Sequence, residues 1–151
     1  MQGRTLFAVF LVALAGCGGG APKSDADQVT QVLKDAAKAV ANGDGDKACS
    51  YLTPDAQRQA ELQVGGGVLG QVDCPTLVKR ATAFLNPLDK KQIEDLQPQN
   101  VQVNGTAASA TLAANPDPSQ SSGVSVQLNL QKLGTDWKIS GFVNEQGLPG
   151  G

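Results

Sequence analysis

The sequence predicts an α+β fold in which helices from the first half of the chain pack on an antiparallel sheet from the second half. Up to about residue 85, apolar residues recur at helical spacing, whereas beyond about residue 100 they alternate with polar residues, as in half-buried strands. Asn104-Gly105 separates two alternating runs and is a strong hairpin signal. Helices followed by hairpin-connected strands are typical of an α+β domain.

The first predicted helix follows Ser24 and ends at Asn42-Gly43. Ser24 is a suitable N-cap residue, and Asp25 and Asp27 place negative charge in the first turn, where the helix dipole favours it. We expect one apolar face to pack against the sheet, because the apolar residues lie three or four positions apart: Val29, Val32, Leu33, Ala36, Ala37 and Val40.

Three further helices are expected before the strands. A short one covers about residues 47–52, and a second runs from Thr53-Pro54 to about Gln63. The last begins at Pro75-Thr76 and ends at Asn86-Pro87, because a residue before proline disfavours helical backbone angles. Its predicted apolar face consists of Leu77, Val78, Ala81, Phe84 and Leu85.

Four strands are expected in the second half. The third has the clearest alternation, so we expect it to be central and to turn its apolar side chains toward the helices. A polar loop at 115–123 precedes it, and Gly134-Thr135-Asp136 turns the chain after it. The apolar positions in strand order are Val101 and Val103; Ala108, Ala110 and Leu112; Val124, Val126, Leu128 and Leu130; Trp137, Ile139 and Val143.

The N-terminus has the parts of a secretion signal. Arg4 supplies positive charge, and residues 6–16 form an uncharged run of eleven that is too short to span a bilayer. Leu14-Ala15-Gly16-Cys17 then resembles the bacterial lipobox, in which the cysteine is lipidated and the chain is cleaved before it. The alternative is a buried helix with an incidental cysteine, but residues 18–22, Gly-Gly-Gly-Ala-Pro, would end such a helix at once.

This resemblance implies how the chain is organised. Residues 1–16 are expected to be the signal peptide, 17–24 a lipidated flexible tether, 25–146 the folded domain and 147–151 a disordered tail. Since the sequence has no second hydrophobic stretch, lipid on Cys17 would be the anchor. We therefore expect a protein of the cell envelope, held at the extracytoplasmic face of a membrane.

Charge argues against a nucleic-acid-binding protein. Removal of residues 1–16 leaves 135 residues with 11 basic and 14 acidic side chains, a formal net charge of −3. The basic pairs Lys79-Arg80 and Lys90-Lys91 are isolated and are not interleaved with aromatic residues. Neither composition nor pattern therefore indicates an RNA- or DNA-binding surface.

If Cys17 carries lipid as expected, Cys49 and Cys74 are the two cysteines that remain. In an exported chain, an even number of cysteines favours a disulfide, which for a loop of this size would stabilise the fold by about 3–4 kcal/mol. A metal site is the alternative, but the chain has no histidine. We expect no metal and no cofactor.

Five segments occur in a characteristic order along the chain: Ala41-Asn42-Gly43-Asp44, Ala48-Cys49-Ser50-Tyr51-Leu52-Thr53-Pro54, Cys74, Val101-Gln102-Val103-Asn104-Gly105-Thr106-Ala107 and Asp136-Trp137-Lys138-Ile139. With the order of the elements, they resemble the NTF2-like superfamily, also called cystatin-like or SnoaL-like, over about residues 25–143. The resemblance implies helices packed into a curved antiparallel sheet, forming a cone that often admits a small ligand. An unrelated α+β domain of similar length is the alternative.

Candidate catalytic residues are few. Enzymes of this superfamily usually work with Asp, Glu, Tyr or His in the cone, and histidine is absent here. Tyr51, the only tyrosine, suits packing better than catalysis, and Asp73 before Pro75 suits a helix cap better than a general base. Asp44 and Asp46 lack the other ligands of a calcium loop, and a single Trp137 on an alternating strand is more often core than a stacking platform.

Two function classes remain, because members of this superfamily include enzymes and domains without chemistry. The first is a membrane-anchored, non-catalytic binding or accessory domain that recognises an apolar small molecule or an envelope protein. The second is a small isomerase or dehydratase of the ketosteroid-isomerase type, using a carboxylate and Tyr51. An ionisable group that faces the cavity would distinguish the enzyme from the binding domain.

Overall fold

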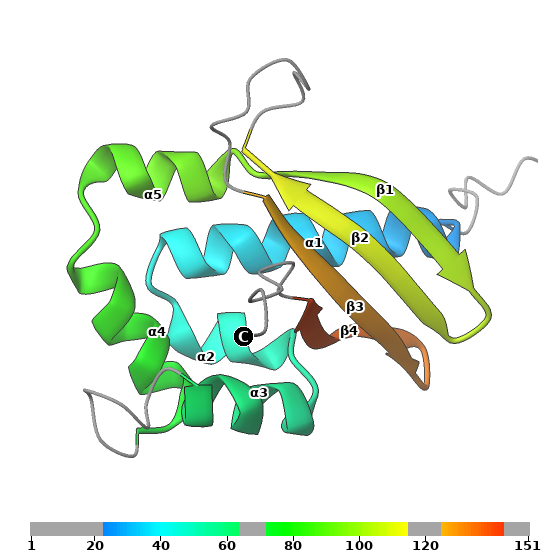
Figure 1. Cartoon of the computed structure of the whole chain (residues 1–151), viewed down its shortest axis with the longest axis horizontal. Helices are drawn as coiled ribbons and strands as arrows, with labels where there is room; N and C mark the ends of the chain where they lie inside the picture. Colours follow the sequence, from blue (N-terminus) through cyan, green and yellow to red (C-terminus); the bar gives the residue numbers. More distant parts are fainter. Residues whose placement is uncertain (1–22, 64–71, 115–124, 144–151) are drawn as a thin grey trace, which may run out of the picture.

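The computed structural model describes residues 23–63, 72–114 and 125–143 (Figure 1). Five helices come first in this part of the chain and four strands follow, so the predicted α+β class is confirmed. The predicted signal peptide with Cys17, most of the tether and the C-terminal tail lie outside the described residues. Among the helices that are described, none is both long and apolar enough to cross a bilayer.

Helix α1, Asp25–Ala41, has the predicted boundaries and a capped start. The Ser24 side chain accepts a hydrogen bond from the Asp27 backbone N–H, and the Asp27 carboxylate accepts one from the Ser24 backbone N–H. This reciprocal pair satisfies two N–H groups that the first turn would leave unbonded. Asn42 caps the other end, and Gly43 follows with a φ of +70°, which favours glycine.

Three short helices follow α1: α2, Gly45–Ser50, α3, Pro54–Ala60, and α4, Cys74–Ala83. All three were expected, and Thr53 caps α3 through the Ala56 N–H as its sequence suggests. The apolar face predicted for α4 is only partly right. Leu77 is buried, but Ala81 and Phe84 are exposed, because the buried side of α4 is the one with Cys74 and Thr82, which faces α2.

Helix α5, Pro87–Glu94, was not predicted. Asn86-Pro87 predicts the end of one helix, and in the structure this dipeptide also begins the next one. The Asn86 side chain accepts hydrogen bonds from the N–H groups of Leu88 and Asp89, and Pro87 occupies the first turn, where its missing N–H costs nothing.

The sheet has the order β1-β2-β3-β4, and every neighbouring pair is antiparallel. Its strands are β1, Gln97–Asn104, β2, Ala107–Ala113, β3, Ser125–Leu133, and β4, Asp136–Val143. β3 is an interior strand, as predicted, with Leu128 and Leu130 buried and Asn129 exposed. Val124, assigned to this strand from the sequence, lies outside the described residues.

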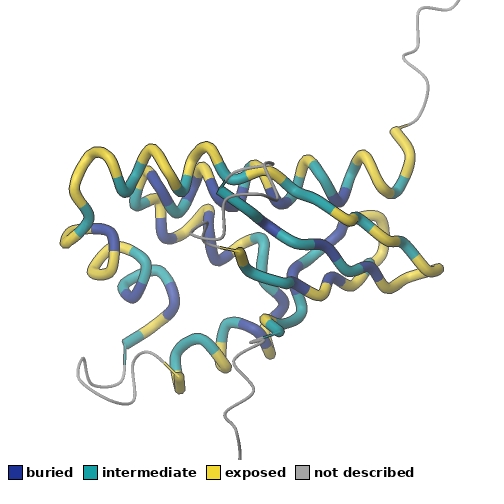
Figure 2. The backbone as a smooth tube through the Cα atoms, turned by 45° about the horizontal axis from the view of Figure 1, so that its top comes forward, coloured by how far each residue is buried: buried dark blue, intermediate teal, exposed yellow. Residues whose placement is uncertain are grey.

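The main core lies between α1 and one face of the sheet. Val29, Leu33 and Ala36 of α1 pack against apolar side chains of β2, β3 and β4: Ala108, Ala110, Leu112, Leu128, Leu130, Trp137 and Ile139. Figure 2 shows that the buried positions of α1 lie along the side of the helix that faces the strands. Trp137 is 2% exposed, so it is a core residue, as its position on an alternating strand suggested.

The segment after α2 joins the helices to the edge of the sheet. The Ile139 N–H donates to the Tyr51 carbonyl at 2.8 Å, and the Thr53 N–H donates to the Ile139 carbonyl at 2.8 Å. Leu52 and Ile139 thereby form a short parallel bridge. This contact fixes Tyr51 beside the start of β4.

Candidate functional site

An open pocket of about 400 Å³ lies where α1, the end of α2 and the start of β4 meet. Val32 and Tyr51 give it apolar surface, and Gln28, Gln31 and Lys138 bring polar groups. Lys23, Thr135, Asp136 and Trp137 complete the lining. Pockets of about 300–1,000 Å³ are the usual size for small-molecule sites, so this one is large enough to hold a ligand.

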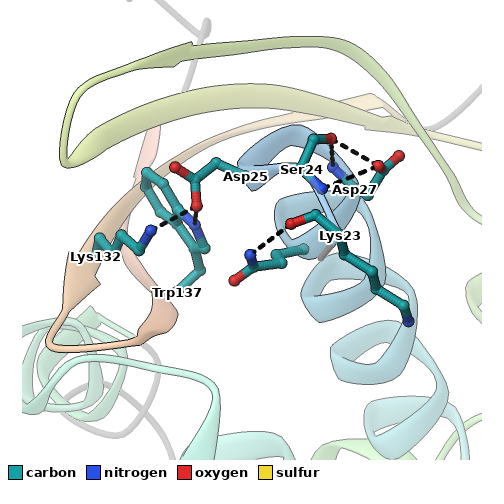
Figure 3. Close-up of polar contacts among 7 residues, drawn as sticks. Lys23, Ser24, Asp25, Asp27, Lys132 and Trp137 are labelled. Atoms are coloured by element: carbon teal, nitrogen blue, oxygen red, sulfur yellow. Dashed lines mark hydrogen bonds and ion pairs between the residues drawn. The ribbon is translucent and has the colours of Figure 1, made fainter. Parts of the chain in front are cut away.

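Behind the pocket, three polar side chains lock α1 to the sheet (Figure 3). Lys132 Nζ donates to Asp25 Oδ1 at 2.6 Å, and Trp137 Nε1 donates to the same oxygen at 3.2 Å. Lys132 Nζ also lies 5.7 Å from the centroid of the Trp137 ring, a cation–π distance. The indole is therefore held in place by both of its neighbours.

The hydrogen bond from Lys132 is the main reason why the pKa of Asp25 lies below its ordinary value. The Trp137 bond lowers the pKa further, and partial burial opposes both effects. The carboxylate is thus stabilised in its charged form, which makes Asp25 an ion-pair partner and a poor proton acceptor near neutral pH.

Tyr51 lines the pocket together with the exposed carboxylate Asp136, but no hydrogen bond joins the two side chains. Tyr51 is the C-cap residue of α2 and is half-buried against the core. Among the described residues, no hydrogen bond joins its hydroxyl to an Asp or Glu. The neighbouring Lys138 Nζ donates to the Ser50 carbonyl at 2.6 Å, which ties the two walls of the pocket together.

The other candidate carboxylates lie at the N-termini of helices. Asp73 is the exposed N-cap residue of α4, and its interaction with the Thr76 side chain lowers its pKa, the direction opposite to that of a general base. Asp44 caps α2 through the Lys47 N–H. Across the described ranges, no group of three or more His, Cys, Asp or Glu side chains could hold a metal ion.

The interior of the described domain contains no ionisable side chain. Its buried polar residues are Thr53 and Thr82, and both hydroxyls are used locally. Thr53 caps α3, and the Thr82 hydroxyl donates to the Val78 carbonyl at 2.8 Å. The space between α1 and the sheet is filled by apolar side chains.

Cys49 and Cys74 form the disulfide that the sequence predicted, with Cα atoms 6.1 Å apart. The bridge joins α2 to the first residue of α4, and both cysteines are buried. Cys17, the predicted lipidation site, lies outside the described residues.

The Asp25–Lys132–Trp137 cluster is not predictable from sequence patterns. Asp25 lies 107 residues before Lys132 and 112 before Trp137, and each residue alone has an ordinary local explanation. Asp25 fits the first turn of a helix, and Trp137 fits a strand core. No short-range signal indicated that the three would meet.

The comparisons with known proteins bear on the fold alone. No protein-family model and no curated protein matches the chain. Among solved structures, the chain is similar to an NTF-2 like protein of unknown function from Shewanella oneidensis MR-1, with 16% identity and a TM-score of 0.44, covering 77% of this chain and 94% of that one. It is also similar to an uncharacterized cystatin fold protein from Novosphingobium aromaticivorans, with 15% identity and a TM-score of 0.37, covering 76% and 96%.

Proposed function

We propose that this protein is a membrane-anchored, non-catalytic binding or accessory lipoprotein that recognises an apolar small molecule or an envelope protein partner. The observation that carries the proposal is the interior of the described domain, which is packed with apolar side chains and holds no ionisable group, while Asp136, the carboxylate that lines the open pocket, is exposed to solvent. Proton transfer next to a carbonyl needs a base within reach of the bound substrate, and a carboxylate works better as that base when burial raises its pKa. The two described carboxylates with shifted pKa values, Asp25 and Asp73, are shifted downward.

The pocket supports recognition of a ligand with an apolar body and a polar end. Val32 and the half-buried Tyr51 ring would contact the apolar body, while Gln28 and Lys138 offer polar groups beside them. Trp137 is the only tryptophan in the chain, so its fluorescence reports on this pocket without interference.

Binding can be tested with the neutral apolar probe N-phenyl-1-naphthylamine. We expect a saturable decrease in Trp137 emission at one probe per protein. Tyr51→Ser should weaken binding about tenfold, the size expected for loss of one large apolar contact. Leu62→Ser, which changes an exposed side chain outside the pocket lining, should leave it unchanged. If Trp137 emission does not change when the probe is added, the proposal that the pocket binds an apolar small molecule is wrong.

The enzyme hypothesis is tested on the same protein. Hydrogen–deuterium exchange next to the carbonyl of a cyclic ketone, followed by NMR in D₂O, should proceed at the buffer rate. If the wild type accelerates the exchange and Tyr51→Phe does not, the protein is an isomerase and the non-catalytic hypothesis is wrong.

Membrane anchorage is supported by the apolar run and the small residues that lead into Cys17. In bacterial cells, a fatty-acid analogue should label the wild-type protein and leave Cys17→Ser unlabelled. Equal labelling of the two proteins would contradict lipidation at this residue.

A further inference from the structure

The turn between α4 and α5 exposes two large apolar side chains. Phe84, the C-cap residue of α4, is 86% exposed, and Leu88 in the first turn of α5 is 73% exposed. We call Phe84, Leu88 and the basic residues Lys90 and Lys91 the α4–α5 corner. Apolar side chains gathered on a protruding surface indicate contact with a partner or a membrane.

Charge at this corner differs from that of the rest of the chain. Residues 73–95, which are α4, α5 and their cap residues, have a formal charge of zero, whereas all other residues together carry −2; the charged residues are Lys79, Arg80, Lys90 and Lys91 against Asp73, Asp89, Glu94 and Asp95. Lys79 is paired with Asp46 at 3.1 Å, and Lys91 with Asp95 at 3.0 Å. Lys90 takes part in no ion pair among the described residues, and Lys91 is exposed three positions after Leu88, on the same side of α5.

We propose that the α4–α5 corner inserts Phe84 and Leu88 into the interface of an anionic lipid bilayer, with Lys90 and Lys91 at the level of the headgroups. The corner lies at one extreme of the long axis of the molecule (Figure 1). Protruding side chains enter a deformable bilayer surface without a matching cavity, and basic residues beside them favour anionic lipid. This inference rests on the membrane anchorage proposed above.

The position of the anchor is compatible with this contact. The chain enters the described domain at Lys23, at the other end of α1 from the corner (Figure 1). α1 has 17 residues and is therefore about 25 Å long. Residues 17–23 can span about 20 Å when extended. A domain lying with α1 along the membrane would bring the corner to the bilayer while Cys17 holds the other end.

The test uses the lipidated full chain in vesicles of phosphatidylglycerol and phosphatidylcholine. An environment-sensitive NBD fluorophore is attached to Leu88→Cys, and to Leu62→Cys as the control. Leu62 lies beyond α3 and is 75% exposed, so the two sites match in residue type and exposure. We expect a blue-shifted emission and quenching by nitroxide-labelled lipid at position 88, and neither at position 62. Replacing phosphatidylglycerol by phosphatidylcholine should reduce the quenching.

Three results would overturn the proposal: a fluorophore at position 88 that stays in water, equal quenching at both positions, or a blue shift without lipid quenching. The last result would show contact with protein, including a second copy of this chain. A second measurement uses vesicle flotation of the unacylated chain, Cys17→Ser. Phe84→Ser with Leu88→Ser should weaken its binding about tenfold or more, given the area that two inserted side chains remove from water.

Failure of this proposal is distinguishable from failure of the proposed function. If fatty-acid label is absent from Cys17, the anchorage is wrong. If Cys17 is labelled and the fluorophore at position 88 remains in water, only the corner contact is wrong.

Discussion

Asp25 has two roles that a sequence pattern cannot separate. Its place in the first turn of α1 suits the helix dipole, and its carboxylate also accepts hydrogen bonds from Lys132 and Trp137 of the β3–β4 hairpin. Because its pKa is lowered in the folded state, deprotonation of Asp25 favours folding. This contribution is present above the ordinary pKa of 3.8 and is lost as the pH falls through the lower folded-state value.

We therefore predict that Asp25→Asn lowers the urea midpoint at pH 7, and that the difference from wild type shrinks below about pH 4. Asp55→Asn is the matched control, since Asp55 is also a first-turn acid, on α3, and pairs only with the exposed Arg58. Its effect should be small at both pH values. A constant difference between Asp25→Asn and wild type from pH 7 to pH 3 would show that the ion pair with Lys132 does not stabilise the fold.

At the scale of elements, α2 and α4 approach so closely that one position between them requires glycine. A Cβ built on Gly45, the first residue of α2, would lie 2.2 Å from the Pro75 carbonyl oxygen. We predict that Gly45→Ala lowers the free energy of unfolding by about 1–3 kcal/mol or more, because the backbone of α4 must shift. Gly141→Ala in β4, where no atom lies within 4 Å of the added Cβ, should change it by less than about 1 kcal/mol. Urea unfolding of the two variants makes the comparison, and equal losses would mean that α2 and α4 can separate without cost.

The register of β3 gives a second prediction about an element. Leu128 is 2% exposed and faces the core, whereas Asn129 faces solvent between Ser109 and Gly141. Leu128→Asp should cost about 4 kcal/mol or more, because a carboxylate would lie unpaired among apolar side chains. Asn129→Asp should stay within about 0.5 kcal/mol of wild type. Similar melting temperatures for both variants would show that the strand is shifted by one residue.

For the whole molecule, local signals predicted most of the fold and little of the site. Ser24, Thr53 and Asn104-Gly105 mark element boundaries because caps and turns depend on neighbouring residues, and the structure has these boundaries. Helix α5 was missed because Asn86-Pro87 is compatible with both an end and a start. The pocket and the Asp25–Lys132–Trp137 cluster depend on packing between distant segments, for which one sequence carries no signal.

The disulfide bears on the stability of the whole molecule, since it joins α4 to α2, which packs on α1. α4 packs mainly on α2, and no side chain of α4 belongs to the main core between α1 and the sheet. Cys49 and Cys74 are 25 positions apart, so closing this loop should stabilise the fold by about 3.5 kcal/mol. We predict a loss of that order in urea unfolding of the double variant Cys49→Ala, Cys74→Ala. Dithiothreitol should destabilise the wild type by the same amount and leave the stability of the double variant unchanged.

In the double variant, amide hydrogen exchange should accelerate most in α4 and α5, because the β2 and β3 amides belong to a core that the bridge does not touch. Uniform acceleration across helices and strands would instead show that the two ends of the molecule unfold as one unit.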